Sequence, residues 1–262
     1  MKVAPTIPES IDHSRSQTLL AQAFLPHPQL GALTFAIGSF YEVLEGGSFG
    51  DRAGFIKQIL ARGEKFAQTA SSVTIGAALS AQAVHDLIST IAASNEGVWI
   101  SNRLGSRVAI DLDQSWVRRQ YAPGRYPAFH APHGWHQDGA LGANFMSIPC
   151  PCKALLEMVT IWIALNPCGI DAPGLELVTS PVEQLLRPEQ LIDSCVRTRF
   201  ADDLYWKPVL SPGDALLFSG AILHRTHVLA GMRQDRTSIE LRCFPAGRLP
   251  SRLKGDRFIS VS

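Results

Sequence analysis

The 262-residue sequence lacks the charge pattern and the long apolar stretches that mark several classes of protein. Only 18% of its residues are charged, its formal net charge is +1, and no basic block occurs. Binding to nucleic acid or to an anionic membrane normally requires such a block, so neither partner is expected. No stretch approaches the roughly 20 apolar residues of a membrane span, and the first residues contain no apolar signal-peptide region. The sequence therefore predicts a cytoplasmic protein.

Cysteine is also scarce, and its spacing does not match a structural zinc site. None of the five cysteines belongs to a CxxC pair. They are Cys150, Cys152, Cys168, Cys195 and Cys243. A proline-containing loop explains the closely spaced first two without a metal or redox role. We expect reduced thiols that take no part in the chemistry.

Apolar residues, at 46%, are sufficient for a substantial core, and we expect one domain spanning residues 1–262. Within residues 1–97, apolar side chains recur every three or four positions in three segments, which predicts a mostly helical layer. The three stripes are Leu30, Leu33, Ile37, Phe40 and Leu44; then Phe55, Ile56, Ile59, Leu60 and Phe66 after a cap at Asp51; then Val84, Leu87, Ile88 and Ile91.

From residue 98 to residue 248 the pattern changes to short strand-like runs punctuated by Gly, Pro and Asn. One further helix is expected near residues 188–195. Runs this short predict a mainly β fold, a double-sheet jelly roll of the cupin kind, buttressed by the N-terminal helices. The runs are VWIS, SRVAIDL, SWVRRQYA, VTIWIALN, GLELVT, WKPVL, DALLFSG and TSIELRCF.

Residues 122–144 form a long segment without periodicity that is rich in aromatic residues and glycine. Long loops within compact domains are often functional. This one contains His130, His133 and His136. We therefore expect it to contribute to a functional site, although chance placement is the simpler explanation for His130 and His133.

His136 and Asp138 are separated by one residue, so in an extended segment both side chains point to the same face. Such a pair is common by chance, so it indicates a site only together with further ligand residues. His224 follows the strand-like run DALLF and supplies a second imidazole. Two histidines and one carboxylate form the facial triad that suits iron(II) and leaves adjacent coordination positions open. A zinc hydrolase uses the same ligand types, so the triad alone does not fix the metal.

Arg236 directly precedes the run TSIELRCF and shares a face with Ser238, because side chains alternate along a strand. A buried arginine needs an anionic partner. Its guanidinium can hold a carboxylate through two hydrogen bonds, and the Ser238 hydroxyl can donate another. The distal carboxylate of 2-oxoglutarate fits this description.

Taken together, these motifs resemble the phytanoyl-CoA dioxygenase family of iron(II)/2-oxoglutarate oxygenases. The resemblance covers roughly residues 114–245. It is carried by GWHQDG, VTIWIALNP followed by GLELV, SPGDALLFSG, the LHRT around His224, and RTSIELR.

The resemblance implies a double-stranded β-helix core in which His136, Asp138 and His224 bind iron(II) and Arg236 binds 2-oxoglutarate. It also implies that O2 and 2-oxoglutarate are converted to succinate and CO2 as a hydrogen atom is abstracted from the substrate. Related halogenases have a small residue where this chain has Asp138, so the resemblance favours hydroxylation over chlorination.

His227 competes with His224 as the third metal ligand, and the HRT context favours His224. Gln120 is a candidate contact to the co-substrate. Arg118 or Arg119 could bind 2-oxoglutarate or a substrate carboxylate. Adjacent strand residues face opposite sides, so at least one of these two arginines should point outward.

Trp135, Trp162 and Arg242 are candidate substrate contacts. Trp162 would either wall the site or belong to the core. Glu240 and Arg242 continue the face of Arg236, as an internal ion pair or as readers of a polar or zwitterionic substrate. The aromatic loop, with Tyr126 and Phe129, suggests a partly apolar pocket.

The leading hypothesis is an oxygenase that hydroxylates a small organic substrate, an amino-acid derivative or a specialised metabolite. Its cofactor would be iron(II), and 2-oxoglutarate and O2 its co-substrates. The alternatives are a non-catalytic jelly-roll protein that binds a ligand or metal, and a zinc-dependent hydrolase. The helical stripes permit either a monomer or a homodimer.

Overall fold

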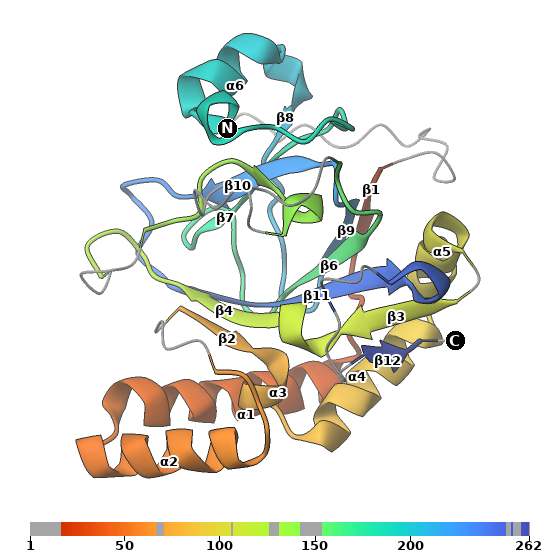
Figure 1. Ribbon diagram of the computed structural model, residues 1–262. Helices are drawn as coiled ribbons and strands as arrows, with labels where there is room; N and C mark the ends of the chain where they lie inside the picture. Colours follow the sequence, from red (N-terminus) through yellow and green to blue (C-terminus); the bar gives the residue numbers. More distant parts are fainter. Residues whose placement is uncertain are drawn as a thin grey trace.

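Two antiparallel β-sheets lie one above the other in the computed structural model (Figure 1). The structure describes residues 17–66, 71–105, 107–125, 131–141, 154–249, 253 and 258–261. In the larger sheet the order is β1-β9-β6-β11-β3-β12, and β4 pairs with both β11 and β2. Its strands are β1 (Thr18–Ala21), β2 (Ser72–Thr74), β3 (Val108–Asp111), β4 (Trp116–Gln120), β6 (Val159–Ala164), β9 (Ala215–Ser219), β11 (Arg236–Pro245) and β12 (Phe258–Ser260).

The smaller sheet has the order β5-β10-β7-β8. Its strands are β5 (His136–Gln137), β7 (Gly174–Val178), β8 (Tyr205–Trp206) and β10 (Leu223–His227). Most of the predicted strand runs are confirmed, and a sheet-rich fold with a helical layer is confirmed with them. Only β8 and an isolated bridge between Cys168 and Leu210 come from the run WKPVL, in which Pro208 has no N–H to donate.

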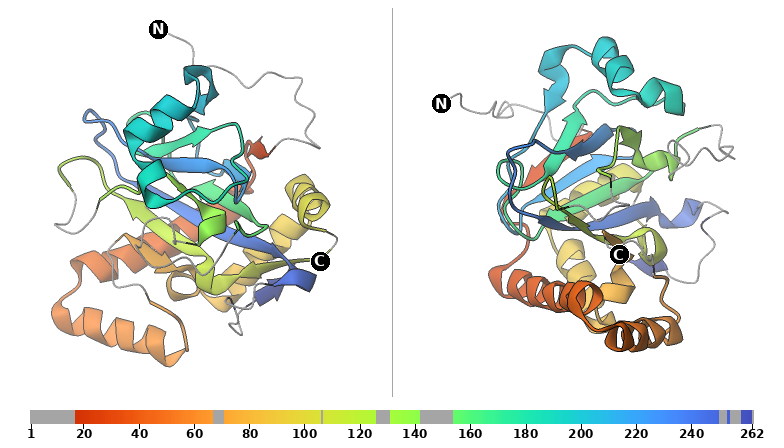
Figure 2. Two further views of the ribbon diagram at one scale, coloured as in Figure 1. Left: turned by 45° about the horizontal axis from the view of Figure 1, so that its top comes forward. Right: turned by 90° about the vertical axis from the view of Figure 1, so that its left-hand side faces the viewer.

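Helices cover the outer faces of both sheets, and the two views of Figure 2 show the same layering. Helices α1 to α4 lie against the larger sheet, and α6 lies over the smaller one. The α-helices are α1 (His27–Gly46), α2 (Phe49–Ala61), α3 (Ile75–Ala78), α4 (Ala81–Ala92), α5 (Asn95–Leu104) and α6 (Asp193–Arg199). Short 3-10 turns are η1 (Leu112–Gln114), η2 (Asp138–Ala140), η3 (Pro188–Leu191), η4 (Asp202–Leu204) and η5 (Ala246–Arg248). Within the described ranges, no helix is both long and apolar enough to span a membrane.

The predicted stripe of α4 is buried and so is that of α1, apart from the half-buried Leu30, but the second stripe was only partly correct. Ser48, not Asp51, caps α2, because the Ser48 hydroxyl accepts the hydrogen bond from the Asp51 N–H. Phe66 lies beyond the end of α2, and Leu60 is exposed. The cap lies three residues before the expected position. Ser48 precedes the first turn of α2, so its hydroxyl can accept the N–H of Asp51, which lies inside that turn.

The strand predicted at residues 98–101 was wrong, since these residues lie within α5. Ser94 caps this helix by accepting from the Gly97 N–H, and Trp99 and Ile100 are buried. A four-residue apolar run does not distinguish a strand from one side of a buried helix. The expected boundary between residues 97 and 98 therefore falls inside a helix, and β1 and β2 belong to the larger sheet although they precede it.

Alternation along the strands of the larger sheet separates two environments. On the helical side, Ile161, Ile163, Ile239 and Leu241 belong to one large apolar core with α1, α4 and α5. On the opposite side, which faces the smaller sheet, Trp162 packs with other apolar residues of both sheets. The same side carries the polar residues of β11, which are Arg236, Ser238, Glu240 and Arg242, all buried. The space between the sheets is therefore the chemically distinctive part of the fold.

The described cysteines are free thiols, as expected. Cys168 and Cys243 are buried, and burial raises the pKa of Cys168 to about 11 and that of Cys243 to about 12. Both thiols stay protonated at neutral pH and are poor nucleophiles. Cys150 and Cys152 lie outside the described residues.

Candidate active site

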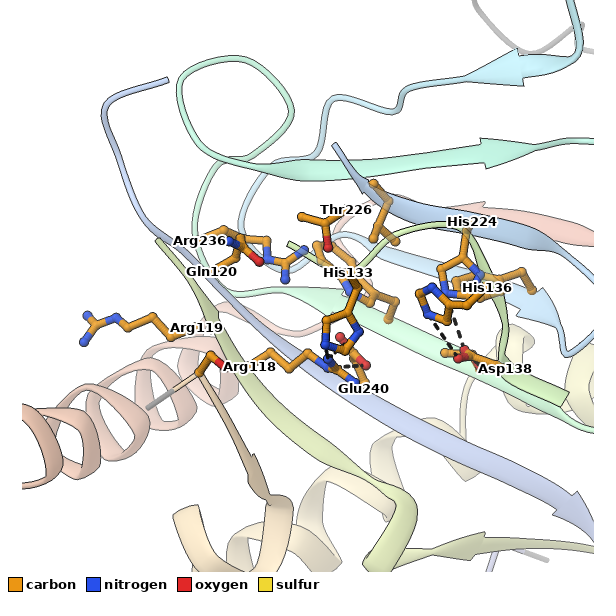
Figure 3. Close-up of a pocket in the computed structure, with 15 residues that line it drawn as sticks. Arg118, Arg119, Gln120, His133, His136, Asp138, His224, Thr226, Arg236 and Glu240 are labelled. Carbon is orange, nitrogen blue, oxygen red and sulfur yellow. Dashed lines mark hydrogen bonds and ion pairs between the residues drawn. The ribbon is translucent and has the colours of Figure 1, made fainter. Parts of the chain in front are cut away.

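Three buried side chains, His136, Asp138 and His224, converge between the two sheets (Figure 3). Strands β5 and β10 pair so that His136 lies directly opposite His224, and Asp138 follows two residues later in η2. One ligand atom from each lies within 4.8 Å of the others. Asp138 Oδ1 is 3.7 Å from His136 Nε2, and Asp138 Oδ2 is 3.7 Å from His224 Nε2. These separations fit three donors around one metal ion.

Backbone carbonyls orient both imidazoles. His136 Nδ1 lies 2.7 Å from the Gly134 carbonyl oxygen, and His224 Nδ1 lies 3.1 Å from that of Ile222. Because a carbonyl only accepts, each Nδ1 carries the proton and each Nε2 offers a lone pair to the metal position. Burial lowers the pKa of His224 to about 4. Burial, then the neighbouring His224 and His133, holds that of His136 well below its usual range. Both rings are neutral at pH 7, the form that binds metal.

Two hydrogen-bond donors, Thr160 and Arg242, hold the Asp138 carboxylate. Thr160 donates its hydroxyl to Oδ2 over 2.6 Å, and the Arg242 guanidinium donates to the same oxygen. Arg242 lies opposite Thr160 across β11 and β6, and its Nη1 is 2.6 Å from the Thr160 hydroxyl oxygen. Burial, with the neighbouring Arg118, lowers the pKa of Arg242 to about 9, so it remains a cation at neutral pH. These contacts fix the orientation of the carboxylate.

Replacing Thr160 with valine should weaken iron(II) binding by roughly 10- to 100-fold, the usual cost of losing a partner of a metal ligand. The change keeps the shape of the side chain and removes one donor to Asp138. Affinity would be measured by anaerobic competition with a chelator. Thr226→Val is the matched control, since Thr226 lines the same cavity and its hydroxyl forms no hydrogen bond with the triad among the described residues. Equal losses in the two variants would contradict the assignment.

Acidification should destabilise the metal-free protein between pH 6.5 and pH 4. The unfolded chain protonates His224 at its ordinary pKa of 6.5, whereas the folded protein does so only at about 4. Within this window the unfolded state binds more protons, so stability is fully present above pH 6.5 and is lost as the pH falls. The difference corresponds to about 3 kcal/mol for His224. Urea unfolding with chelator at several pH values measures it. We expect a shallower dependence in His224→Gln and an unchanged one in His85→Gln, which alters an exposed histidine.

Arg236 lines the same cavity, Ser238 lies on the same face of β11, and both have unsatisfied polar atoms. Arg236 is 2% exposed, and its Nε and Nη1 have no hydrogen-bond partner among the described residues. The Ser238 hydroxyl likewise has none there. The Arg236 guanidinium lies 5.0 Å from the centre of the Trp162 ring, and burial lowers its pKa. A buried cation beside an unused hydroxyl is costly on its own, and a carboxylate ligand would satisfy both.

Strand β4 supplies three further expected residues. Gln120 lies opposite Arg236 in the β4–β11 pairing, is buried, and lines the cavity. Arg118 points inward, where its Nε is 2.9 Å from Glu240 Oε2. Arg119 also lines the cavity, but its side chain points away from the triad, as Figure 3 shows, and binds Glu45 at 2.9 Å. The structure thus orients one arginine to each side of the strand, as alternation predicts.

Of the remaining candidate residues, some line the cavity and others lie elsewhere. Trp162 lines the cavity. Trp135 does not: it packs on the outer side of the smaller sheet, where its indole N–H donates to Asp193 over 2.8 Å. The expected substrate contact from Trp135 is therefore corrected, because its neighbour His136 takes the inward face. His227 lies outside the triad, whereas His224 belongs to it. Tyr126, Phe129 and His130 fall outside the described residues.

Sequence reasoning gave no role to several cavity residues, notably Ser71, Leu175, Phe218 and Thr226. Phe218 and Thr226 share faces with Leu216 and His224 on their strands, so alternation around the triad could have indicated them. Ser71 precedes β2, which carried no clear strand pattern. It could not have been found in this way.

No protein-family model and no curated protein sequence matches this chain. Solved structures do match. The apoform of EctD from S. alaskensis aligns with a TM-score of 0.64 and 13% identity, covering 97% of this chain and 84% of that one. SnoN, a non-haem α-ketoglutarate-dependent epimerase from nogalamycin biosynthesis, aligns at 0.58 and 12%, covering 95% and 96%. ThoJ, a non-haem monooxygenase, aligns at 0.55 and 11%, covering 88% and 75%. At these identities the likeness shows a shared fold.

Proposed function

We propose that this chain is an iron(II)- and 2-oxoglutarate-dependent oxygenase of the phytanoyl-CoA dioxygenase type, with a double-stranded β-helix core, that hydroxylates a small organic molecule. One observation carries the proposal: a buried His-Asp-His triad and a buried arginine with unsatisfied nitrogens line the same cavity, and Ser238 lies on the same face of β11 as that arginine. The triad requires a metal, and the arginine requires an anion. A metal-chelating dicarboxylate satisfies both.

His136, Asp138 and His224 would hold iron(II), a ligand set that leaves adjacent positions open. Arg236 and Ser238 would bind the distal carboxylate of 2-oxoglutarate, and Gln120 lies beside them as a further polar contact. Bound iron and 2-oxoglutarate would supply the oxidising chemistry, with consumption of O2 and release of succinate and CO2. Structures of SnoN with Fe3+ and α-ketoglutarate, and of EctD with 2-oxoglutarate, have the same fold and support this choice of ligands.

Apolar side chains of the cavity would limit access of water to the reaction. Trp162, Leu175 and Phe218 line the space beside the triad. Such walls strengthen the electrostatic contacts of Arg236 and protect a reactive centre from side reactions. Asp138 occupies the carboxylate position, so chlorination is not expected, and we propose hydroxylation as the outcome. Structures of this fold also include an epimerase, so the product must be identified chemically.

The first test is anaerobic titration of the iron(II)-loaded protein with 2-oxoglutarate. We expect a weak visible charge-transfer band that saturates at one equivalent of 2-oxoglutarate. Admission of O2 should then yield succinate in proportion to the 2-oxoglutarate consumed. Zinc(II)-loaded protein is the control, because zinc binds to the same ligand types and has no redox chemistry. Stoichiometric iron binding without a band and without succinate would reject the proposal.

A further inference from the structure

The middle of the cavity is lined by Arg118, Glu240 and His133. Figure 3 shows them between the triad on one side and Arg236 with Gln120 on the other. The chain of contacts is short. Arg118 Nη1 lies 3.0 Å from His133 Nδ1 and 2.9 Å from Nε2, and the His133 ring centre lies 5.7 Å from that of His136. The proposed function uses none of these three residues.

Arg118 is fixed in place, but not all of its N–H donors form hydrogen bonds with described residues. Its backbone lies between β2 and β11, opposite Ser72 and Ser238. Glu240 accepts from its Nε over 2.9 Å, and the two side chains are only 16% and 9% exposed. Nη1 contacts His133, while Nη2 donates no hydrogen bond to any described residue. Within the described part of the chain, the two Nη2 N–H donors of this cavity-lining guanidinium are therefore unused.

The charges of the site do not balance once the proposed cofactor and co-substrate are present. Arg118, Arg236 and Arg242 contribute three positive charges and iron(II) contributes two. Asp138 and Glu240 contribute two negative charges, and 2-oxoglutarate contributes two more. Histidine binds metal as the neutral imidazole, so the two triad histidines add no charge. One positive charge remains in a buried site, where an uncompensated charge is costly. A ligand with one net negative charge would neutralise it.

We propose that Arg118 binds the carboxylate of a small monoanionic substrate. This inference rests on the proposed function and names the substrate class for the same site. Glu240 is a positioning residue: it holds Nε and turns the Nη2 edge of the guanidinium toward the ligand. Arg118 lies close to the His133–His136 pair, which places the carboxylate near the triad and brings the rest of the molecule within reach of the metal position.

The test compares matched pairs of probes that differ in charge and little else. The pairs are benzoate and benzamide, cyclohexanecarboxylate and its amide, hexanoate and hexanamide, and 3-phenylpropanoate and its amide. Binding is titrated by ligand-observed NMR to protein loaded with zinc(II), which prevents turnover. Saturating 2-oxoglutarate keeps the probes away from Arg236. We expect carboxylates to bind at least tenfold more tightly than their amides in the wild type.

Arg118→Met should abolish this preference, and Arg119→Met should keep it. The two variants change the net charge equally at neighbouring positions of β4, but the Arg118 side chain points to Glu240 and the Arg119 side chain points away, to Glu45. Arg118→Gln, which retains a polar side chain, should also lose the preference and serves if the methionine variant is unstable. Affinity for 2-oxoglutarate should stay within about threefold of wild type in every variant.

Three results would overturn the inference. The first is equal binding, or no binding, of carboxylates and amides in the wild type. The second is an equal effect of Arg118→Met and Arg119→Met. The third is a loss of 2-oxoglutarate affinity in Arg118→Met, which would assign Arg118 to the co-substrate. Failure of the proposed function is distinguishable, because wild-type protein would then bind metal without binding 2-oxoglutarate.

Discussion

The His224→Ala variant should lose more than 100-fold in iron(II) affinity, while His227→Ala stays within about threefold of wild type. Loss of a direct ligand should exceed the roughly 10- to 100-fold cost of losing an outer partner. His224 supplies one of three protein ligands, and its Nε2 faces Asp138 at 3.7 Å. His227 lies on the same strand but outside the triad. Comparing the two variants separates the loss of a metal ligand from a general effect of removing an imidazole.

Anaerobic titration against a competing chelator gives the two affinities. Urea unfolding of both metal-free variants controls for folding. If His227→Ala were the variant that lost the metal, the third ligand would be misassigned. If both retained it, the ion would be bound elsewhere.

Arg236→Met should weaken 2-oxoglutarate binding and, in the absence of ligand, stabilise the protein. Removing one partner of a buried, hydrogen-bonded charge pair costs about 2–5 kcal/mol, or roughly 30-fold to several thousand-fold in affinity. Without a carboxylate, Arg236 is a buried cation with two unsatisfied nitrogens among the described residues. A methionine of similar length would pack against Trp162 and remove that cost, which should raise the unfolding free energy by at least about 1 kcal/mol.

Two measurements on the same preparation test this pair of effects. Calorimetric titration with zinc(II) present gives 2-oxoglutarate affinity, and urea unfolding without ligand gives stability. Ser238→Ala is the companion variant: it removes the hydroxyl and leaves the charge, so we expect a smaller loss of affinity. A destabilised Arg236→Met with unchanged 2-oxoglutarate affinity would mean that the arginine serves the fold and does not bind the co-substrate.

The sequence predicted the elements whose side chains have one strong periodicity. The stripes of α1 and α4 recur at helical spacing over three or more turns, and the runs of β6, β9 and β11 are continuous apolar or alternating segments. Helix α5 was missed because its apolar run is limited to residues 98–100. The signal that identifies it, the Ser94 cap, lies before that run.

Short strands could not be recognised because their existence depends on a partner. β5 has two residues, and it forms through pairing of His136 and Gln137 with β10. β2 has three and pairs only with β4. Two or three residues are too few to show the alternation by which a strand is recognised. The positions of His136, Asp138, His224 and Arg236 in one cavity, and of Ser238 on the same strand face as Arg236, were predictable from motif order and alternation, although their chemical roles stay predictions.

The contacts of the charged residues could not be predicted, because alternation gives a face and not a partner. Glu240 and Arg242 were expected to form an ion pair. Their closest atoms are 3.7 Å apart, but each has a nearer partner, Arg118 for Glu240 and Asp138 for Arg242. These partners come from β4 and from the turn after β5, which lie more than 100 residues away in the chain.

Strand β11 carries Arg236, Ser238, Glu240 and Arg242 on one face and Ile239 and Leu241 on the other. An insertion or deletion of one residue within it would exchange the two faces for the rest of the strand. Guanidinium groups would enter the apolar core, and isoleucine would line the cavity. Point substitutions alter one contact at a time and spare the others. Divergence of specificity in this scaffold should therefore proceed through substitutions in β11, with its length held constant, while length changes accumulate in the loops.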